Sequence, residues 1–231
     1  MVHRRCCLLE ALLMKGVVKG AFILLVFTML VAAPAQAETV TANVTGQVVS
    51  NGIGNPPLSG VNSGDSVALS FTVDSNNFVD GIPGDTRGYV IDQSSFSLTF
   101  ASLLTLGLQD PFPGGQTPYF TLVDGNPVSD GFFVSTSPAA PGGVPLVQEP
   151  YPLNLNLGYT GDTLDSLDIL DAIGVYGFGG LTSSNFNLWL LFPGNVSMEM
   201  DFGQMTITPE PATFALLLVG GLAVLRRKRA T

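Results

Sequence analysis

The chain alternates apolar residues with small or polar ones along much of its length, and this period of two constrains its fold more than any other feature. The segment 67–73, for example, places valine, leucine, phenylalanine and valine at every second position. Successive side chains of a β-strand point to opposite faces, so such a run predicts a strand with one buried face. The same pattern recurs in the segments 40–48, 96–100, 153–159, 186–192 and 196–202. Stretches rich in glycine and proline separate these runs and predict turns.

We expect residues 38–208 to form one all-β domain, a jelly-roll-like β-sandwich of roughly eight to ten strands. The period slips by one residue at Gly203, which predicts a β-bulge or a strand break. One segment departs from the period of two, because aspartates and leucines each recur every third residue between Asp162 and Asp171. Residues three apart are neighbours on a helix, so we expect one short helix near residues 162–172.

Residues 1–37 have the composition of a signal peptide, which predicts export by the general secretion machinery. Two lysines precede an uncharged apolar run at residues 21–33, and an alanine-x-alanine cleavage site follows it. The residues of the expected cleavage site are Ala35, Ala37 and Glu38. Met14 alone would also begin a well-proportioned signal, so the true start stays open between the two methionines.

Residues 209–231 consist of three ordered parts. The motif Pro209, Glu210 and Pro211 comes first, and fourteen uncharged residues follow it at 212–225. A basic cluster then follows, made up of Arg226, Arg227, Lys228 and Arg229. Fourteen helical residues extend about 21 Å, short of a hydrocarbon core of ~30 Å, so a membrane helix here needs local thinning of the bilayer. The basic cluster favours the cytoplasmic side, which leaves residues 38–208 outside the cell.

This tail resembles the PEP-CTERM sorting signal of exported bacterial proteins. The resemblance implies that an exosortase, a membrane peptidase, recognises Pro209, Glu210 and Pro211 as a processing site and cleaves the tail. It further implies a protein tethered to the inner membrane by its C-terminal helix before processing, and found at the cell surface or outside the cell afterwards. Relatives of this kind occur in bacteria that make extracellular polysaccharide. An ordinary C-terminal membrane anchor is the alternative interpretation.

Between its two ends the chain is strongly acidic and chemically restricted. Residues 38–208 carry sixteen carboxylates against one base, Arg87, a net charge of −15. Such a surface repels nucleic acids, so we expect no DNA or RNA partner. The same residues include no cysteine, histidine or lysine, which excludes thiol, Ser-His-Asp and Schiff-base catalysis. We therefore predict that the protein is not an enzyme; a glycosidase using Glu199 and Asp201 on one strand face is the remote alternative.

A candidate calcium site follows the run at 67–73. Its oxygen ligands would be Asp74, Asn76, Asp80 and Asp85, on a glycine-containing loop. The alternative is a series of Asx turns, in which these side chains bond their own backbone. We expect Arg87 to pair with a neighbouring aspartate.

These features predict an exported acidic surface or matrix protein with a structural role linked to extracellular polysaccharide or biofilm. The alternative function is a calcium-assisted glycan-binding module, because β-sandwiches often bind sugars through exposed aromatic residues. The aromatic candidates for such a surface are Trp189, Tyr119, Tyr151 and Tyr176.

Overall fold

The computed structural model describes residues 38–101, 103–125, 129–147, 151–190 and 196–210. The predicted signal peptide, membrane segment and basic cluster lie outside these residues. Within the described part of the chain, no helix is long and apolar enough to cross a membrane.

The described residues form an all-β domain, as the period of two predicts. Eleven strands and one 3-10 turn follow each other along the chain: β1 (Thr39–Asn51), η1 (Leu58–Gly60), β2 (Ser66–Asp80), β3 (Thr86–Ile91), β4 (Ser97–Phe100), β5 (Leu104–Leu106), β6 (Tyr119–Gly125), β7 (Ser129–Ser135), β8 (Leu153–Thr160), β9 (Gly174–Tyr176), β10 (Leu181–Leu190) and β11 (Val196–Pro209).

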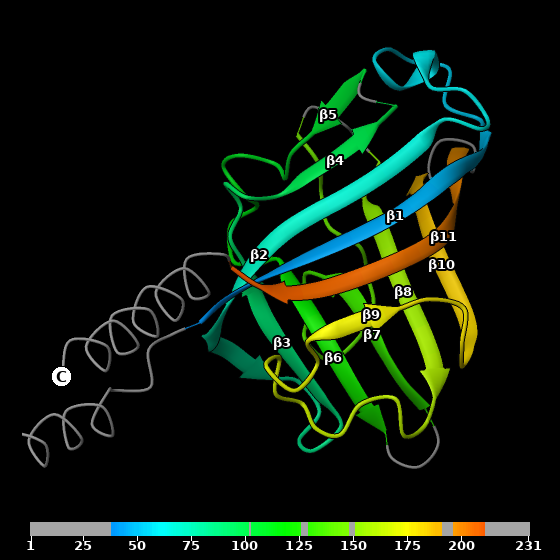
Figure 1. Ribbon diagram of the computed structural model, residues 1–231. Coiled ribbons are helices and arrows are strands. Elements are labelled where there is room, and N and C mark those ends of the chain that lie inside the picture. The colour runs from blue at the N-terminus through cyan, green and yellow to red at the C-terminus, as the bar shows by residue number, and fades with distance from the viewer. Residues whose placement is uncertain (1–37, 102, 126–128, 148–150, 191–195, 211–231) are drawn as a thin grey trace, which may run out of the picture. The chain divides into compact units, whose positions relative to one another are not determined.

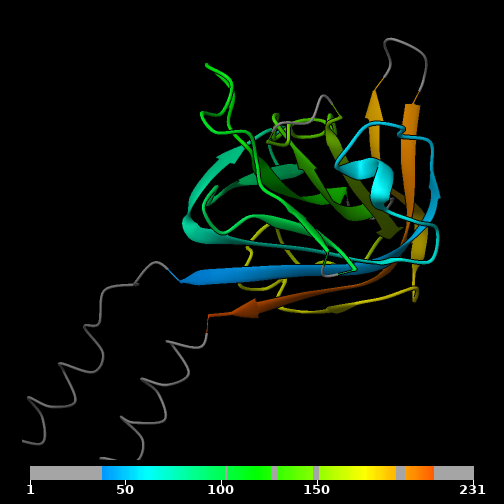
Figure 2. The same ribbon diagram turned by 90° about the horizontal axis from the view of Figure 1, so that it is seen from above.

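All strands belong to one antiparallel sheet, and this sheet closes on itself (Figure 1). Eight strands surround the barrel in the order β1-β11-β10-β8-β7-β6-β3-β2, and β2 pairs back with β1. Figure 2 shows β1 and β11 side by side along one wall. The predicted β-sandwich is therefore wrong for the described residues. A sandwich keeps two sheets with free edges, whereas here the first and last strands of the eight-strand order, β1 and β2, pair with each other.

Alternate residues of each strand fill the barrel. In the ladder of β1 and β2, Val44 lies opposite Leu69 and Ala42 lies opposite Phe71, and all four side chains are buried. Aromatic rings continue this core across the interior, because Phe120 packs on Phe71 with ring centroids 5.2 Å apart. An eight-stranded barrel is just wide enough for side chains to fill it, so the apolar face of every strand becomes core.

Three short strands lie outside this circuit. β4 pairs with the first half of β2, β5 pairs with β4, and β9 pairs with β11. β2 can serve two neighbours on one edge because it pairs with β4 over residues 67–70 and with β3 from Val73 onward. The second half of β11 likewise leaves β10 and takes β9 as its partner.

A β-bulge interrupts the pairing of β1 with β11, which confirms the predicted irregularity at Gly203. The partners change from Thr45 and Gln204 to Gly46 and Phe202, so Gly203 is the extra residue. The two backbones approach so closely here that a Cβ on Gly46 would collide with the carbonyl oxygen of Asp201. Bulges bend and twist a strand, which is the deformation that closing a sheet into a barrel requires.

No helix forms near residues 162–172, so that prediction is also wrong. Side-chain oxygens take up backbone N–H groups that a helix would need: the Asp168 amide donates to Ser166 Oγ (3.0 Å), and the Leu170 amide donates to Asp168 Oδ1 (3.0 Å). Such local bonds favour turns over helix. Asp162 has a φ of 71°, in the left-handed region, which no α-helix accommodates.

Residues 161–180, here called the plug, cross one end of the barrel instead (the lower end in Figure 1). Leu164, Ile169 and Ala172 of the plug are buried in the same core as the strands. Leu167 and Leu170 are only partly buried, so the turns bury a different set of residues from the stripe that a helix would have buried.

The close contact at Gly46 predicts a large effect for a very small substitution. Gly46→Ala should lower the free energy of unfolding by about 1–3 kcal/mol, because a methyl group forces the β1 and β11 backbones apart at the bulge. Chemical denaturation measures this change. Gly54→Ala is the matched control, since its Cβ meets nothing within 4 Å. Equal stability of the two variants would contradict the proposed tight closure.

Candidate functional site

Four asparagines gather on the outer wall of the barrel where β8 meets β10. Asn154 and Asn156 alternate along β8 with leucines that point into the core. On β10, Asn185 and Asn187 flank the buried Phe186. The strand register places Asn154 opposite Asn187 and Asn156 opposite Asn185, so all four side chains share one outward surface, here called the asparagine face.

Hydrogen bonds order part of this face. Asn154 Nδ2 donates to Asn187 Oδ1 (3.1 Å), and Asn187 Nδ2 donates to Asn185 Oδ1 (2.7 Å). Asn187 Nδ2 also lies 3.4 Å from Glu199 Oε2 on β11. Asn156 takes no part in these three bonds. The face therefore combines fixed amides with one whose donors and acceptor are available to a ligand.

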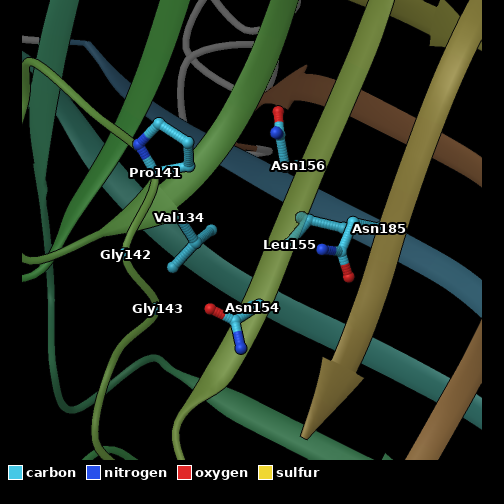
Figure 3. A pocket seen from close by; sticks show the side chains of 8 residues that line it. All are labelled: Val134, Pro141, Gly142, Gly143, Asn154, Leu155, Asn156 and Asn185. Carbon is cyan, nitrogen blue, oxygen red and sulfur yellow. The ribbon is translucent and has the colours of Figure 1, made fainter. Parts of the chain in front are cut away.

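A surface hollow of about 180 Å³ opens on the asparagine face (Figure 3). Asn154, Asn156 and Asn185 line one side of the hollow, and the loop Pro141–Gly143 lines the other. Gly143 has a φ of 74°, and a Cβ there would lie 2.6 Å from Asn154 Oδ1. Only glycine fits this approach of the loop to β8. The hollow is smaller than a drug-sized pocket, so it suits one small polar group or part of a ring.

A second, wider hollow of about 380 Å³ adjoins the first one. The two share Gly142 and Gly143, and the second is lined further by prolines and by Gln116 and Thr136. The loop thus separates two shallow depressions along one surface, which favours an extended ligand over a single enclosed one.

Trp189 extends the asparagine face along β10. It follows Asn187 by two residues, lies opposite Ser197 of β11, and is 42% exposed. An exposed indole presents a flat apolar surface with one N–H donor, next to amides that both donate and accept. A sugar ring has the complementary chemistry, since it carries apolar C–H groups on its faces and hydroxyl groups at its rim.

The other predicted aromatic candidates have structural positions. Tyr151 is buried, and Tyr176 packs on Phe132 of the core with ring centroids 4.7 Å apart. Tyr119 is half-buried on β6. Only Trp189 among the four is exposed enough to stack on a ligand.

Glu199 and Asp201, the carboxylates of the glycosidase alternative, are both exposed on β11. Neither lines either hollow. A glycosidase needs its two acids on opposite sides of one bound sugar bond. The exposed strand positions of Glu199 and Asp201 provide no such enclosure.

The predicted calcium ligands lie on β2 and in the turn after it. Asp74 Oδ1 accepts the Asn76 amide (2.8 Å), which is an Asx turn, and Asp80 Oδ1 accepts Arg87 Nε (2.7 Å). Asp85 is exposed in the turn. Among the described residues no three or more acidic, histidine or cysteine side chains gather closely enough to hold a metal. Calcium binding by these residues stays a prediction.

The predicted ion pair of Arg87 is confirmed, with Asp80 as its partner. The guanidinium carbon also lies 4.2 Å from the centre of the Phe78 ring. The hydrogen bond to Asp80 raises the pKa of Arg87 above its ordinary value. The one base between residues 38 and 208 is therefore engaged on the barrel surface, away from the asparagine face.

The expected processing sites lie beside each other where they are described. Pro209 is the last residue of β11 and lies opposite Val40. The Glu210 amide donates to the Thr39 carbonyl (2.9 Å), and the Glu38 amide donates to Ser75 Oγ (3.1 Å). Ala35, Ala37 and Pro211 fall outside the described residues, as do Arg226, Arg227, Lys228 and Arg229. Cleavage at either site stays a prediction.

Two tyrosine hydroxyls of the barrel fasten the plug, and a third lies within the plug itself. Tyr89 donates to the Leu167 carbonyl (2.7 Å) and accepts the Ile169 amide (2.9 Å). Tyr159 donates to a plug carbonyl as well, and Tyr176 bonds back to the plug's own backbone. Burial raises the pKa of Tyr159 and of Tyr176 to about 12, and it raises the pKa of Tyr89 too.

These tyrosines predict a loss of stability at alkaline pH. In the unfolded chain they ionise near pH 10, whereas burial keeps Tyr159 and Tyr176 protonated up to about pH 12 in the fold. Their contribution is complete below about pH 10 and is lost as the pH rises from there to about 12. Denaturation at several pH values, with tyrosinate absorbance, measures it. Tyr159→Phe should make the decline shallower, and a constant free energy of unfolding across this window would contradict the assignment.

The asparagine face was not singled out from the sequence, although asparagine pairs at alternating positions of two predicted strands are a visible signal. Only the register of β8 against β10 shows that the pairs meet. No family model, curated protein or solved structure matches the chain, so the interpretation of this face rests on its own geometry and chemistry.

Proposed function

We propose that this chain is an exported, non-enzymatic surface or matrix protein that binds neutral polysaccharide through the asparagine face and Trp189. The observation that carries the proposal is the alignment of four asparagines by the β8 and β10 register, next to an exposed indole. A ladder of amides offers donors and acceptors at the spacing of a strand, and an extended glycan offers hydroxyl groups to match.

The charge of the protein favours a neutral ligand. Sixteen carboxylates and one base surround a face whose own polar groups are amides. An acidic polysaccharide would be repelled by this field, whereas a neutral one is indifferent to it. Shallow hollows joined along one surface favour contact with a long chain at several points.

A glycan-binding barrel also fits the structural role expected from the sequence, because a non-catalytic contact to polysaccharide is what a matrix component needs. Sorting by an exosortase at Pro209, Glu210 and Pro211 belongs to the same proposal and rests on the resemblance of the tail. The proposal also includes export of the chain, with the signal peptide removed by cleavage before Glu38.

The test uses the intrinsic fluorescence of the protein, since Trp189 is its only tryptophan. The full chain is titrated with neutral glucans and mannans and with a uronic acid polymer. We expect a change in tryptophan emission with at least one neutral polysaccharide and none with the acidic one. Unchanged tryptophan emission with every neutral polysaccharide would contradict the proposal.

Asn187→Ala separates the asparagine face from other surfaces. It removes the amide that accepts from Asn154 and donates to Asn185, so the face loses its fixed arrangement and its affinity for the glycan should fall about tenfold. Asn43→Ala is the matched control, an exposed asparagine on β1. Equal affinities of the two variants would exclude the asparagine face as the binding surface.

A further inference from the structure

Two aspartates face each other at the end of the barrel that the plug covers. Asp124 on β6 lies directly opposite Asp130 on β7. The preceding pair inward, Leu122 and Phe132, is fully buried, so the aspartates continue a row of interior side chains. Cβ atoms of directly opposed residues are roughly 4.5–5.5 Å apart, which brings both carboxylates into one small space.

Asp130 is the more constrained of the two aspartates. Its side chain is 1% exposed, and Oδ2 accepts the backbone amides of Thr163 (2.6 Å) and Leu164 (2.8 Å). Its other oxygen, Oδ1, is buried and has no partner among the described residues. Asp124 Oδ1 is buried without such a partner as well. Two buried carboxylate oxygens thus have no hydrogen-bond donor among the described residues.

No side chain of the described residues supplies the missing positive charge. Arg87 is the only base between residues 38 and 208, and it is bonded to Asp80. The neighbour of Asp130 on β8 is Tyr159, whose hydroxyl donates to the Gly177 carbonyl. A buried charge without a partner is strongly unfavourable, and like charges placed directly opposite each other add to this cost.

We infer that a calcium ion binds between Asp124 and Asp130 and fastens the plug to the barrel. Calcium takes oxygen ligands, tolerates irregular geometry and completes its shell with carbonyl groups and water, so two carboxylate oxygens form the core of a site. This position differs from the turn after β2 that the sequence pattern suggested.

The site links calcium to the order of the plug. The ion holds Oδ1 of Asp130, and Oδ2 of the same carboxylate holds the first two amides of the plug after Asp162. When calcium is bound, it therefore holds Asp130 in place, and Asp130 in turn holds the start of the plug at Thr163 and Leu164. Hydrogen exchange of the Thr163 and Leu164 amides should slow when calcium binds.

The test measures thermal unfolding and calorimetric binding of the full chain in EDTA and in calcium chloride. Calcium at about a hundred times its dissociation constant should raise Tm by about 5–10 °C. Asp124→Asn keeps the shape of the side chain and leaves the bonds of Asp130 intact. We expect this variant to lose the calcium response while its Tm in EDTA is no lower than that of the wild type, because one of two opposed charges is gone.

Asp201→Asn is the matched control, an exposed aspartate on β11, which pairs with neither β6 nor β7. It should keep the full calcium response. A wild-type Tm and heat signal that do not respond to millimolar calcium would overturn the inference. So would a response that survives in Asp124→Asn or disappears in Asp201→Asn. The outcome is independent of glycan binding, which the Asn187→Ala titration tests separately.

Discussion

The pairing of β1 along both of its edges is the constraint on which the rest of the structure depends. Residues 40–47 of β1 are aligned with β2 on one side and with β11 on the other. The second of these ladders joins the first strand of the chain to the last, so it forms only when the whole intervening chain is in place. Without it the sheet would have two long free edges, and its apolar face could not enclose a core.

Closure also explains where the functional surfaces lie. Once the inner face is filled by side chains, ligands can reach only the outer wall or the ends. The outer wall at β8 and β10 carries the asparagine face, because residues that alternate with the core leucines must point outward. The end beneath β6 and β7 needs a cover, which the plug provides through Leu164 and Ile169.

Much of the fold follows from the period of two, and its failures have physical causes. Predicted runs correspond to β1, β2, β4, β8, β10 and β11. β7 escaped prediction because residues 130–135 are buried on both faces, so the run does not alternate. The loop after β7 also covers part of the outer wall, because its Pro138 lies close against Gly88 on β3. Alternation alone cannot distinguish a barrel from a sandwich, since both bury one face of each strand, and only strand order decides.

The predicted helix failed for a different reason. A repeat of three aspartates and leucines does not require a helix, because successive turns can bury apolar residues of the same segment, here Leu164, Ile169 and Ala172. Side-chain bonds from Ser166 and Asp168, together with the grip of Asp130 on the Thr163 amide, favour the turns. No predicted site includes Asp130, and only the register of β6 against β7 brings it opposite Asp124.

The distribution of charge ties these surfaces together. Several aspartates in this acidic chain bond nearby backbone amides at the surface, as Asp74 and Asp92 do, so they need no base. Asp124 and Asp130 differ from these, because burial removes water from an oxygen of each that has no partner among the described residues. The asparagine face is the opposite case, where the chain uses neutral amides on a wall open to solvent. An acidic protein that keeps one face uncharged can approach a neutral polymer without an electrostatic cost, while its buried carboxylates still require a cation.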